Sequence, residues 1–297
     1  MIGVFDIGGS RVKAAVSART GALEPLGAVD TPGASFPAFA QALRSLLPPG
    51  AERVAVSIAG CVDPDSGVMR CANIPCVDGI MLADDLQRAL DLPVTVVNDA
   101  DAFALAEAGS GAGAGHRTVF GVILGTGVGG GLVIDGRLVT GPGGFAGEWG
   151  HGPVMNRHVR GHDLPVFACG CGLDGCLDPV GGARGLERLH ETLHNRARPS
   201  RGIEDDWQAG DPEATETVAV WADLLAAPLA MIVNTVGATV VPVGGGLGKS
   251  EALVATLDAA VRGLTLYRHK APLLVQAHHR VEPGLIGAAH AGWQAHG

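Results

Sequence analysis

The order strand, glycine-rich turn, strand occurs twice in the sequence, and this repetition limits the folds that the chain can adopt. The first copy, IGVFDIGGSRVKAAVSA, occupies residues 2–18. The second occupies residues 118–140 and contains the run GVILGTGVGGGLVIDGRLVT. In that run Asp135 and Gly136 stand between two apolar segments, which predicts a tight hairpin. Because strand and helix patterns alternate through the rest of the chain, we expect a duplicated α/β unit.

The glycines of the second loop fit two interpretations. Gly125, Gly127 and Gly130 have the spacing G-x-G-x-x-G of dinucleotide sites, but such a site needs a helix directly after the turn. A strand that reverses through Asp-Gly follows instead, which argues against a nicotinamide oxidoreductase. We therefore interpret the loop as a hairpin tip whose backbone N–H groups face phosphate oxygens, joined by the hydroxyl of Thr126. A purely structural turn is the alternative.

Several other classes of function are disfavoured. The run GGGLGKS at residues 244–250 lacks the first glycine of a P-loop, because Val243 occupies that position. The formal net charge is −9, and without a basic cluster we expect no nucleic-acid partner and no anionic-membrane surface. We expect no apolar run of the roughly 18 residues that a membrane helix needs. The start MIGVFDIGGS has no basic segment typical of a signal peptide, so the expected location is the cytoplasm.

The first glycine loop places an acid beside the predicted phosphates. Asp6 ends a strand and is followed by two glycines and the hydroxyl of Ser10. An acid at this position suits a Mg²⁺ ion that bridges it to phosphate oxygens, directly or through water. Arg11 or Lys13 could add positive charge, although either also fits a solvated strand edge.

Three cysteines within eight residues predict a metal site. Cys169, Cys171 and Cys176 have the pattern C-x-C-x₄-C with glycines between them, and in a reduced chain such crowding favours a metal over a disulfide. Structural zinc takes four nitrogen or sulfur ligands, so one more is required. The histidines that spacing leaves open for this role are His151, His158 and His162.

Taken together, the DIGGS loop, the Gly125-Thr126-Gly127 loop and the run Val243–Gly246 resemble the two phosphate motifs and the adenosine motif of the actin–hexokinase ATPase superfamily. Within it the chain resembles the ROK group of repressors and sugar kinases, most closely its N-acetylglucosamine kinase branch. The resemblance implies a two-lobed, duplicated ribonuclease H-like fold with a central cleft. One lobe would comprise residues 1–115 and 284–297, and the other residues 116–283. The implied ATP-binding residues are Asp6, Gly8, Gly9, Ser10, Arg11, Gly125, Thr126, Gly127, Val128, Gly129, Gly130, Gly244, Gly245 and Gly246.

Asp99 is the candidate catalytic residue. The segment VVNDADAFALAEA places Asn98 and Asp99 where a strand ends and a helix begins, and a helix N-cap explains such residues equally well. The ROK pattern N-D-A-x-x-x-A implies that Asp99 is the base that deprotonates a sugar hydroxyl and that Asn98 binds the sugar. The family usually has Asn at the position of Asp101, to which we assign no role.

The resemblance also implies the sugar and zinc ligands. The run GEWGH, residues 147–151, is similar to the ROK motif in which a glutamate and a histidine bind the sugar and the histidine also binds zinc. It selects His151 as the fourth zinc ligand. The family usually has Glu where this chain has Asp178, and that departure bears on the choice of sugar. The implied sugar-binding residues are Gly60, Asn73, Asn98, Asp99, Glu148, His151 and Asp178.

The implied activity is an ATP- and Mg²⁺-dependent kinase, with structural Zn²⁺, that phosphorylates the 6-hydroxyl of N-acetyl-D-glucosamine. Glucose and N-acetylmannosamine are the alternative sugars of the same family. A sugar-responsive regulator is a further alternative. Such regulators carry an additional N-terminal helix-turn-helix domain and need a positive face, whereas the first phosphate strand here starts at residue 2 and the net charge is −9. The resemblance also implies a homodimer.

Overall fold

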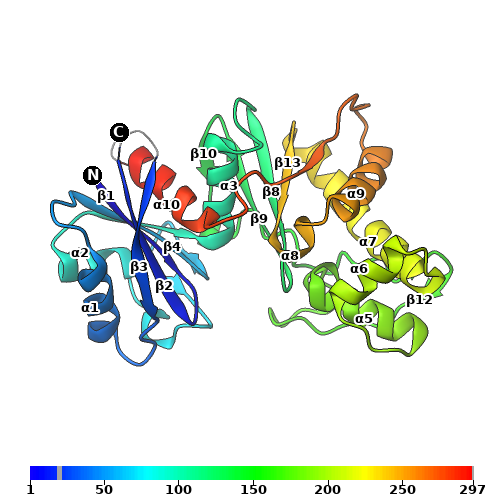
Figure 1. Cartoon of the computed structure of the whole chain (residues 1–297), viewed down its shortest axis with the longest axis horizontal. Helices are drawn as coiled ribbons and strands as arrows, with labels where there is room; N and C mark the ends of the chain where they lie inside the picture. The colour runs from blue at the N-terminus through cyan, green and yellow to red at the C-terminus, as the bar shows by residue number, and fades with distance from the viewer. Residues whose placement is uncertain (19–21, 296–297) are drawn as a thin grey trace. The chain divides into compact units, whose positions relative to one another are not determined.

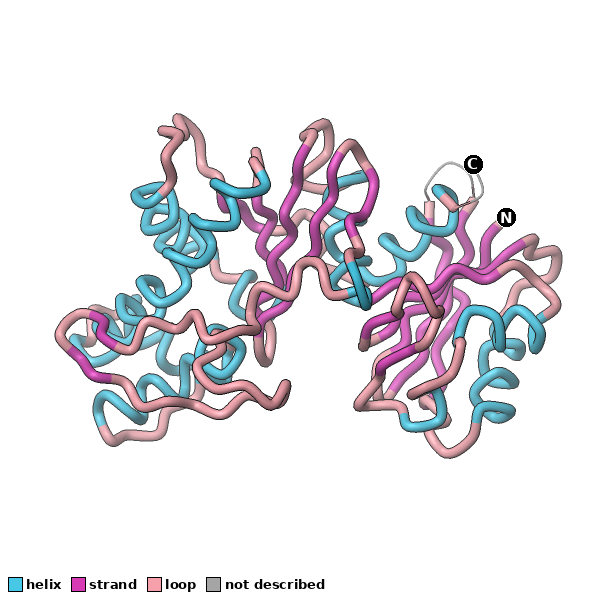
Figure 2. Tube along the Cα trace, turned by 180° about the vertical axis from the view of Figure 1, so that it is seen from behind, coloured by secondary structure: helices cyan, strands magenta, loops and turns pink. Residues whose placement is uncertain are grey.

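The computed structural model describes residues 1–18 and 22–295 (Figures 1 and 2). The chain forms two compact units, of which the first contains residues 1–115, 131–147 and 279–297 and the second contains residues 116–130 and 148–278. The lobe boundaries expected from the sequence stay a prediction. The compact units share the boundary after residue 115 but group residues 131–147 and 279–283 with the first unit.

The first unit contains a five-stranded sheet in the order β3-β2-β1-β4-β7. β1 pairs in antiparallel fashion with β2 and in parallel with β4, and β7 continues the parallel part. The carboxyl ends of β1, β4 and β7 therefore lie at one edge of the sheet. The strands are β1 (Ile2–Ile7), β2 (Arg11–Ser17), β3 (Leu23–Asp30), β4 (Arg53–Ile58) and β7 (Val94–Asn98).

Helices cover both faces of this sheet (Figure 1). Alternate residues of β1 face opposite sides, so Phe5 and Ile7 join the core with α1 and α2, whereas Ile2 and Val4 pack with α10. Asp6 belongs to the α10 side by the same alternation. The helices are α1 (Phe36–Leu46), α2 (Leu82–Leu90), α3 (Asp99–Ser110) and α10 (Pro283–Gln294), and the short elements are β5 (Cys61–Val62), β6 (Met69–Arg70), η1 (Pro75–Val77) and η2 (Pro142–Gly144).

A second five-stranded sheet has the order β10-β9-β8-β13-β14. Its β9–β10 hairpin is antiparallel and its β8, β13 and β14 are parallel, so it repeats the arrangement of the first sheet in chain order. The predicted duplication is confirmed. Asp135 and Gly136 form the predicted hairpin turn with φ of +50° and +74°. The strands are β8 (Thr118–Leu124), β9 (Val128–Ile134), β10 (Arg137–Val139), β13 (Val241–Gly244) and β14 (Leu274–Gln276), to which the pair β11 (His158–Val159) and β12 (His162–Asp163) is added.

The core helix of the second unit is α7, Pro212–Val236. The Asp211 side chain caps its first turn by accepting the Ala214 N–H at 2.8 Å, and Gly237 ends it in the left-handed conformation. The remaining helices are α4 (Asp178–Gly181), α5 (Ala183–His194), α6 (Ser200–Gln208), α8 (Gly245–Gly248) and α9 (Glu251–Leu264).

The expectation that no segment has the length and hydropathy of a membrane helix is wrong for α7. Its most apolar window has a mean hydropathy of 1.6, and in length and composition it could cross a membrane. However, 61% of that window is buried inside the protein, and Trp221 and Leu225 are fully buried. A long apolar helix of this kind is typical of a protein core.

Candidate active site

The carboxyl ends of the parallel strands in the first unit bring together several of the predicted site residues. β1 leads into the DIGGS loop, β4 into Gly60, and β7 into Asn98 and Asp99. Asn73, from the segment after β6, reaches the same place, because a Cβ atom built on Gly9 would lie 3.4 Å from the Asn73 Cβ. This edge is where open α/β sheets bind ligands.

Asp6 is held in place at this edge. Its Oδ1 accepts a hydrogen bond from the Ser57 hydroxyl at 3.0 Å. Burial raises the pKa of the Asp6 carboxyl, while Ser57 and the positive charge of Lys13 oppose that rise. Lys13 is paired with both carboxylate oxygens of Glu282 at 3.0 Å. The positive charge beside Asp6 therefore comes from an ion-paired Lys13.

Arg11 lies apart from that ion pair. Its guanidinium is 3.8 Å from Asp30 on the exposed edge formed by β2 and β3. A contact between exposed groups at this distance contributes little to holding the side chain. The implied role of Arg11 in ATP binding thus stays a prediction.

Asn98 caps α3 and positions Asp99. The Asn98 Oδ1 accepts the N–H groups of Ala100 and Asp101 at 2.7 and 3.2 Å, and its Nδ2 donates to the Gly60 carbonyl at 2.8 Å. Since an amide carries two N–H donors, one remains for a ligand. The N-cap interpretation is therefore confirmed, and the sugar contact implied for Asn98 stays a prediction.

Asp99 is the first residue of α3 and its side chain is open to solvent. Surrounding protein nevertheless raises the pKa of its carboxyl, mainly by desolvation and further through the negative charge of Asp6. The Ala100 N–H, which reaches Asp99 Oδ1 at 2.9 Å, opposes the rise. A carboxylate with a raised pKa and access to solvent has the properties of a general base.

Gly60 leaves no room for a side chain. Its φ is +118°, and a Cβ atom would lie 2.3 Å from the Arg70 carbonyl oxygen and 2.7 Å from Met69. This close approach places Gly60 against β6. Because the Gly60 carbonyl accepts a hydrogen bond from the Asn98 side chain, β6 helps to position the residue that precedes Asp99.

The loop Gly125-Thr126-Gly127 belongs to the second unit and joins β8 to β9. It is closed by a hydrogen bond from the Gly125 N–H to the Gly127 carbonyl at 3.0 Å. The carbonyl groups of Gly125 and Thr126 accept the N–H groups of Ala183 and Arg184 at 2.8 and 3.4 Å, which attaches the loop to the start of α5. The Thr126 side chain is exposed.

The predicted adenosine motif lies against the same loop. β13 runs parallel to β8 with Gly244 opposite Ile123. Gly245 follows with φ of +82°, and a Cβ atom there would lie 2.4 Å from the Leu124 carbonyl group. The structure thus brings together the second phosphate motif and the adenosine motif, both at the carboxyl ends of parallel strands in the second unit.

Asp178 connects this loop to the cysteine segment. Its Oδ1 accepts the Val128 N–H at 3.0 Å, and its own N–H donates to the Gly150 carbonyl at 3.0 Å. The carboxylate was expected to bind sugar. One of its oxygens is engaged by the backbone that follows the phosphate loop, and the second oxygen is the one suited to a ligand.

Four side chains form a group that fits a tetrahedral metal ion. The ligand atoms of His151, Cys169, Cys171 and Cys176 lie within 4.8 Å of one another. The His151 Nδ1 is 3.5 Å from Cys169 Sγ, and Cys171 Sγ is 3.7 Å from Cys176 Sγ. A tetrahedron with zinc–sulfur bonds of about 2.3 Å and a zinc–nitrogen bond of about 2.0 Å has edges of about 3.8 and 3.5 Å.

The three candidate histidines differ in their contacts, and the zinc ligand set stays a prediction. His158 contacts Asp163, and His162 Nε2 lies 2.7 Å from Glu216, so neither belongs to the group. His151 turns its other nitrogen, Nε2, toward the Glu148 carboxylate at 3.5 Å. A carboxylate behind a histidine ligand orients the ring in many metal sites.

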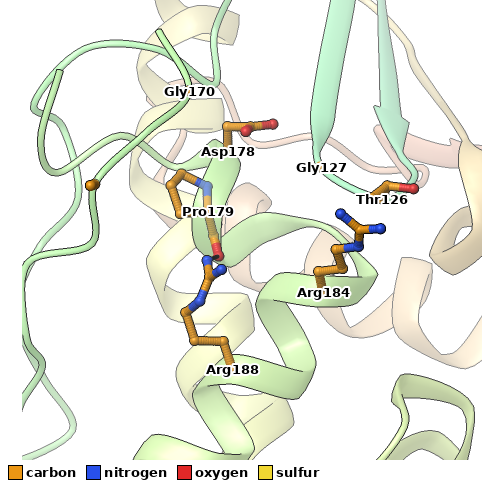
Figure 3. A pocket seen from close by; sticks show the side chains of 8 residues that line it. Thr126, Gly127, Gly170, Asp178, Pro179, Arg184 and Arg188 are labelled. Atoms are coloured by element: carbon orange, nitrogen blue, oxygen red, sulfur yellow. Dashed lines mark hydrogen bonds between the residues drawn. The ribbon is translucent and has the colours of Figure 1, made fainter. Parts of the chain in front are cut away.

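A small cavity beside the phosphate loop contains two arginines that the sequence interpretation missed (Figure 3). It has a volume of about 240 Å³. Both arginines come from α5, whose amphipathic pattern was also missed because polar residues dominate it. The lining residues are Thr126, Gly127, Ala168, Gly170, Asp178, Pro179, Arg184 and Arg188.

Comparisons with known proteins place this arrangement in a family. A family model described as ROK family matches residues 1–294. N-acetyl-D-glucosamine kinase of Salmonella heidelberg is 35% identical over 293 residues, which cover 96% of this chain and 97% of that protein. The chain thus resembles, over almost its whole length, a protein that is named as a sugar kinase.

Solved structures give the same result. A ROK hexokinase from Thermus thermophilus superposes with a TM-score of 0.84 at 32% identity, covering 99% of this chain and 98% of that one. A ROK family glucokinase from Streptomyces griseus, in complex with glucose and AMPPNP, has a TM-score of 0.76 at 27% identity and covers 98% of both chains. The predicted actin-like ATPase fold class is confirmed, and the chain belongs to the ROK family.

Proposed function

We propose that the chain is an ATP-dependent sugar kinase that phosphorylates the 6-hydroxyl of N-acetyl-D-glucosamine. The observation that carries the proposal is the environment of Asp99, a solvent-accessible carboxylate with a raised pKa at the strand edge that also holds Asp6 and Asn73. The 35% identity to a named N-acetyl-D-glucosamine kinase supports the choice of sugar.

The proposed reaction needs few chemical groups. Asp99 accepts the proton of the sugar hydroxyl, whose oxygen attacks the γ-phosphorus of ATP while the bond to the β-γ bridging oxygen breaks and ADP leaves. Phosphoryl transfer depends on positioning and on neutralising charge. The backbone N–H groups of both glycine loops suit the phosphate oxygens, and Asp6 suits the waters of a nucleotide-bound Mg²⁺.

A zinc ion in the proposed enzyme would be held by His151, Cys169, Cys171 and Cys176, and its role would be structural. Four protein ligands would fill a tetrahedral shell and would leave no position for substrate. Cys176 lies two residues before Asp178, and Gly150 lies directly before His151. Two of the ligands are therefore close in sequence to Asp178, which contacts the second phosphate loop, and to Gly150, which contacts Asp178. An ion held by these ligands would stabilise that loop.

Glucose is the second candidate sugar. The chain is 27% identical to a ROK glucokinase whose structure contains glucose, and Asp178 is shorter than the family's usual glutamate. A site built to hydrogen-bond a hydroxyl discriminates by up to about 10⁴–10⁵-fold against analogues that lack it. A panel of sugars therefore separates the candidates clearly.

The test is a coupled ADP-release assay with N-acetyl-D-glucosamine, glucose and N-acetylmannosamine. Asp99→Asn should lower kcat by about 10²–10⁴-fold, the usual contribution of a general base, with sugar binding retained. Asp84→Asn is the matched control, since Asp84 is an exposed acid in the first turn of α2. Absence of ADP release with every sugar would refute the kinase, and near-normal turnover by Asp99→Asn would refute the base.

A further inference from the structure

We propose that Arg184 binds the phosphate oxygens of the nucleotide, as the cationic side chain that complements the backbone of the second phosphate loop. This inference rests on the proposed kinase function. Arg184 is in the first turn of α5, and its backbone N–H donates to the Thr126 carbonyl at 3.4 Å. Its side chain extends toward Thr126 in the cavity beside the loop (Figure 3).

The cavity has room for only part of a nucleotide. Its volume of about 240 Å³ is below the roughly 300–1,000 Å³ of pockets that enclose a whole drug-sized ligand. A nucleotide therefore does not fit inside it, but a phosphoryl group does. Gly244, Gly245 and Gly246, the predicted adenosine motif, are not among the lining residues. The cavity is thus placed for the phosphates and not for the nucleoside.

The charges around the cavity favour an anion. Two guanidinium groups, of Arg184 and Arg188, line the cavity together with one carboxylate, of Asp178. The Asp178 Oδ1 already accepts the Val128 N–H, so part of its negative charge is compensated within the protein. The amino end of α5, a helix of 12 residues, adds partial positive charge at the same place.

The two arginines differ in what already engages them. Arg188 donates to the Pro179 carbonyl, and its guanidinium lies 5.4 Å from the centre of the Phe167 ring. Arg184 forms no ion pair with any carboxylate in residues 1–18 and 22–295. A guanidinium is always charged and presents a planar set of donors that matches phosphate oxygens. Arg184 is therefore the arginine whose donors are available, and Arg188 supports the wall of the cavity.

The experiment compares Arg184→Ala and Arg184→Lys with the unchanged protein and with Arg201→Ala, an exposed arginine on α6. Calorimetry measures the Kd of AMPPNP and of the sugar, and metal analysis measures bound zinc. Arg184→Ala should raise the Kd of AMPPNP about 10- to 100-fold, the range of a hydrogen bond to a charged group. The Kd of the sugar and the zinc content should stay unchanged.

Two further readouts separate phosphate binding from a structural role. Arg184→Lys should recover part of the AMPPNP affinity, because it keeps the charge but loses the planar fork. The AMPPNP affinity of Arg184→Ala should depend less on ionic strength than that of the unchanged protein, because one charge contact is gone.

The outcomes distinguish this inference from the proposed function. If the unchanged protein phosphorylates a sugar but Arg184→Ala binds AMPPNP within threefold of it, Arg184 does not bind phosphate and only this inference fails. If the unchanged protein neither binds AMPPNP nor releases ADP with any sugar, the kinase proposal fails first. A loss of zinc or of sugar affinity in Arg184→Ala would assign Arg184 a structural role and overturn the inference.

Discussion

Gly182 controls the position of the second phosphate loop. It stands between α4 and α5 with φ of −86° and ψ of −171°, a conformation that any residue adopts. A Cβ atom there would lie 2.5 Å from the carbonyl oxygens of both Thr126 and Gly127 and 2.6 Å from the Gly127 Cα. All three atoms belong to the backbone, so Gly182→Ala cannot be accommodated by rotating a side chain.

The size of the displacement follows from these distances. Ordinary van der Waals contact of a Cβ atom starts at 3.4 Å, so the loop must retreat by about 0.9 Å from α5. Hydrogen bonds from Ala183 and Arg184 to the loop carbonyls would lengthen together with it. A shift of about 1 Å in a group that positions a reacting phosphate costs roughly 10²-fold in rate. Overpacking of this kind lowers the free energy of unfolding by about 1–3 kcal/mol.

The assay is ADP release with saturating sugar and varied ATP, with Tm measured on the same preparations. Gly182→Ala should lower kcat/KM for ATP about 100-fold. Gly263→Ala is the matched control, because a Cβ atom at that position of α9 meets nothing within 4 Å. A folded Gly182→Ala protein with kcat/KM within threefold of the unchanged protein would show that the loop position does not matter, and the reasoning would be refuted.

Three further predictions concern other parts of the site. Asp99→Asn should raise Tm at pH 7, because desolvation by the surrounding protein raises the folded-state pKa of Asp99 and its ionisation therefore destabilises the fold as pH rises through that pKa. The gain in Tm should vanish below about pH 3.9, where the carboxyl is protonated in both states. Treatment of reduced protein with a chelator should lower Tm and turnover together, and added zinc should restore both; Cys176→Ser should lose the metal, whereas Cys61→Ser should keep it. Gly60→Ala should lower turnover and raise the KM for sugar, because its Cβ would lie 2.3 Å from the Arg70 carbonyl oxygen; a turnover and a KM for sugar equal to those of the unchanged protein would contradict this reasoning.

The local rules of sequence predicted the parts of this structure that depend on neighbouring residues. The hairpin at Asp135 and Gly136 follows from turn chemistry, and the N-cap at Asn98 follows from the preference for a short polar acceptor at a helix start. The repetition of strand, glycine loop and strand indicated the duplicated sheets because both copies have the same pattern of chain reversal. Each of these features spans only a few residues.

Contacts between segments that are distant in the sequence could not be predicted from such local patterns. No spacing rule connects Arg184 to Thr126, because more than fifty positions separate them in the sequence. They meet only because α5 starts beside the loop. The same holds for His151 and the cysteines, where spacing alone left three histidines open. Which histidine joins the cysteines depends on which one the fold places near the thiols. His158 and His162 instead contact Asp163 and Glu216.

Asp178 shows why a departure from a family pattern has to be interpreted in three dimensions. From the sequence alone, the shorter acid in place of the usual glutamate bears only on the choice of sugar. In the structure its Oδ1 accepts the Val128 N–H at 3.0 Å, and a Cβ atom on Gly127 would lie 2.1 Å from that same oxygen. The carboxylate therefore packs directly against the phosphate loop, two residues after the thiol of Cys176. The residue at this position connects the cysteine segment to the loop, and we expect its length to affect how both are held as well as the proposed choice of sugar.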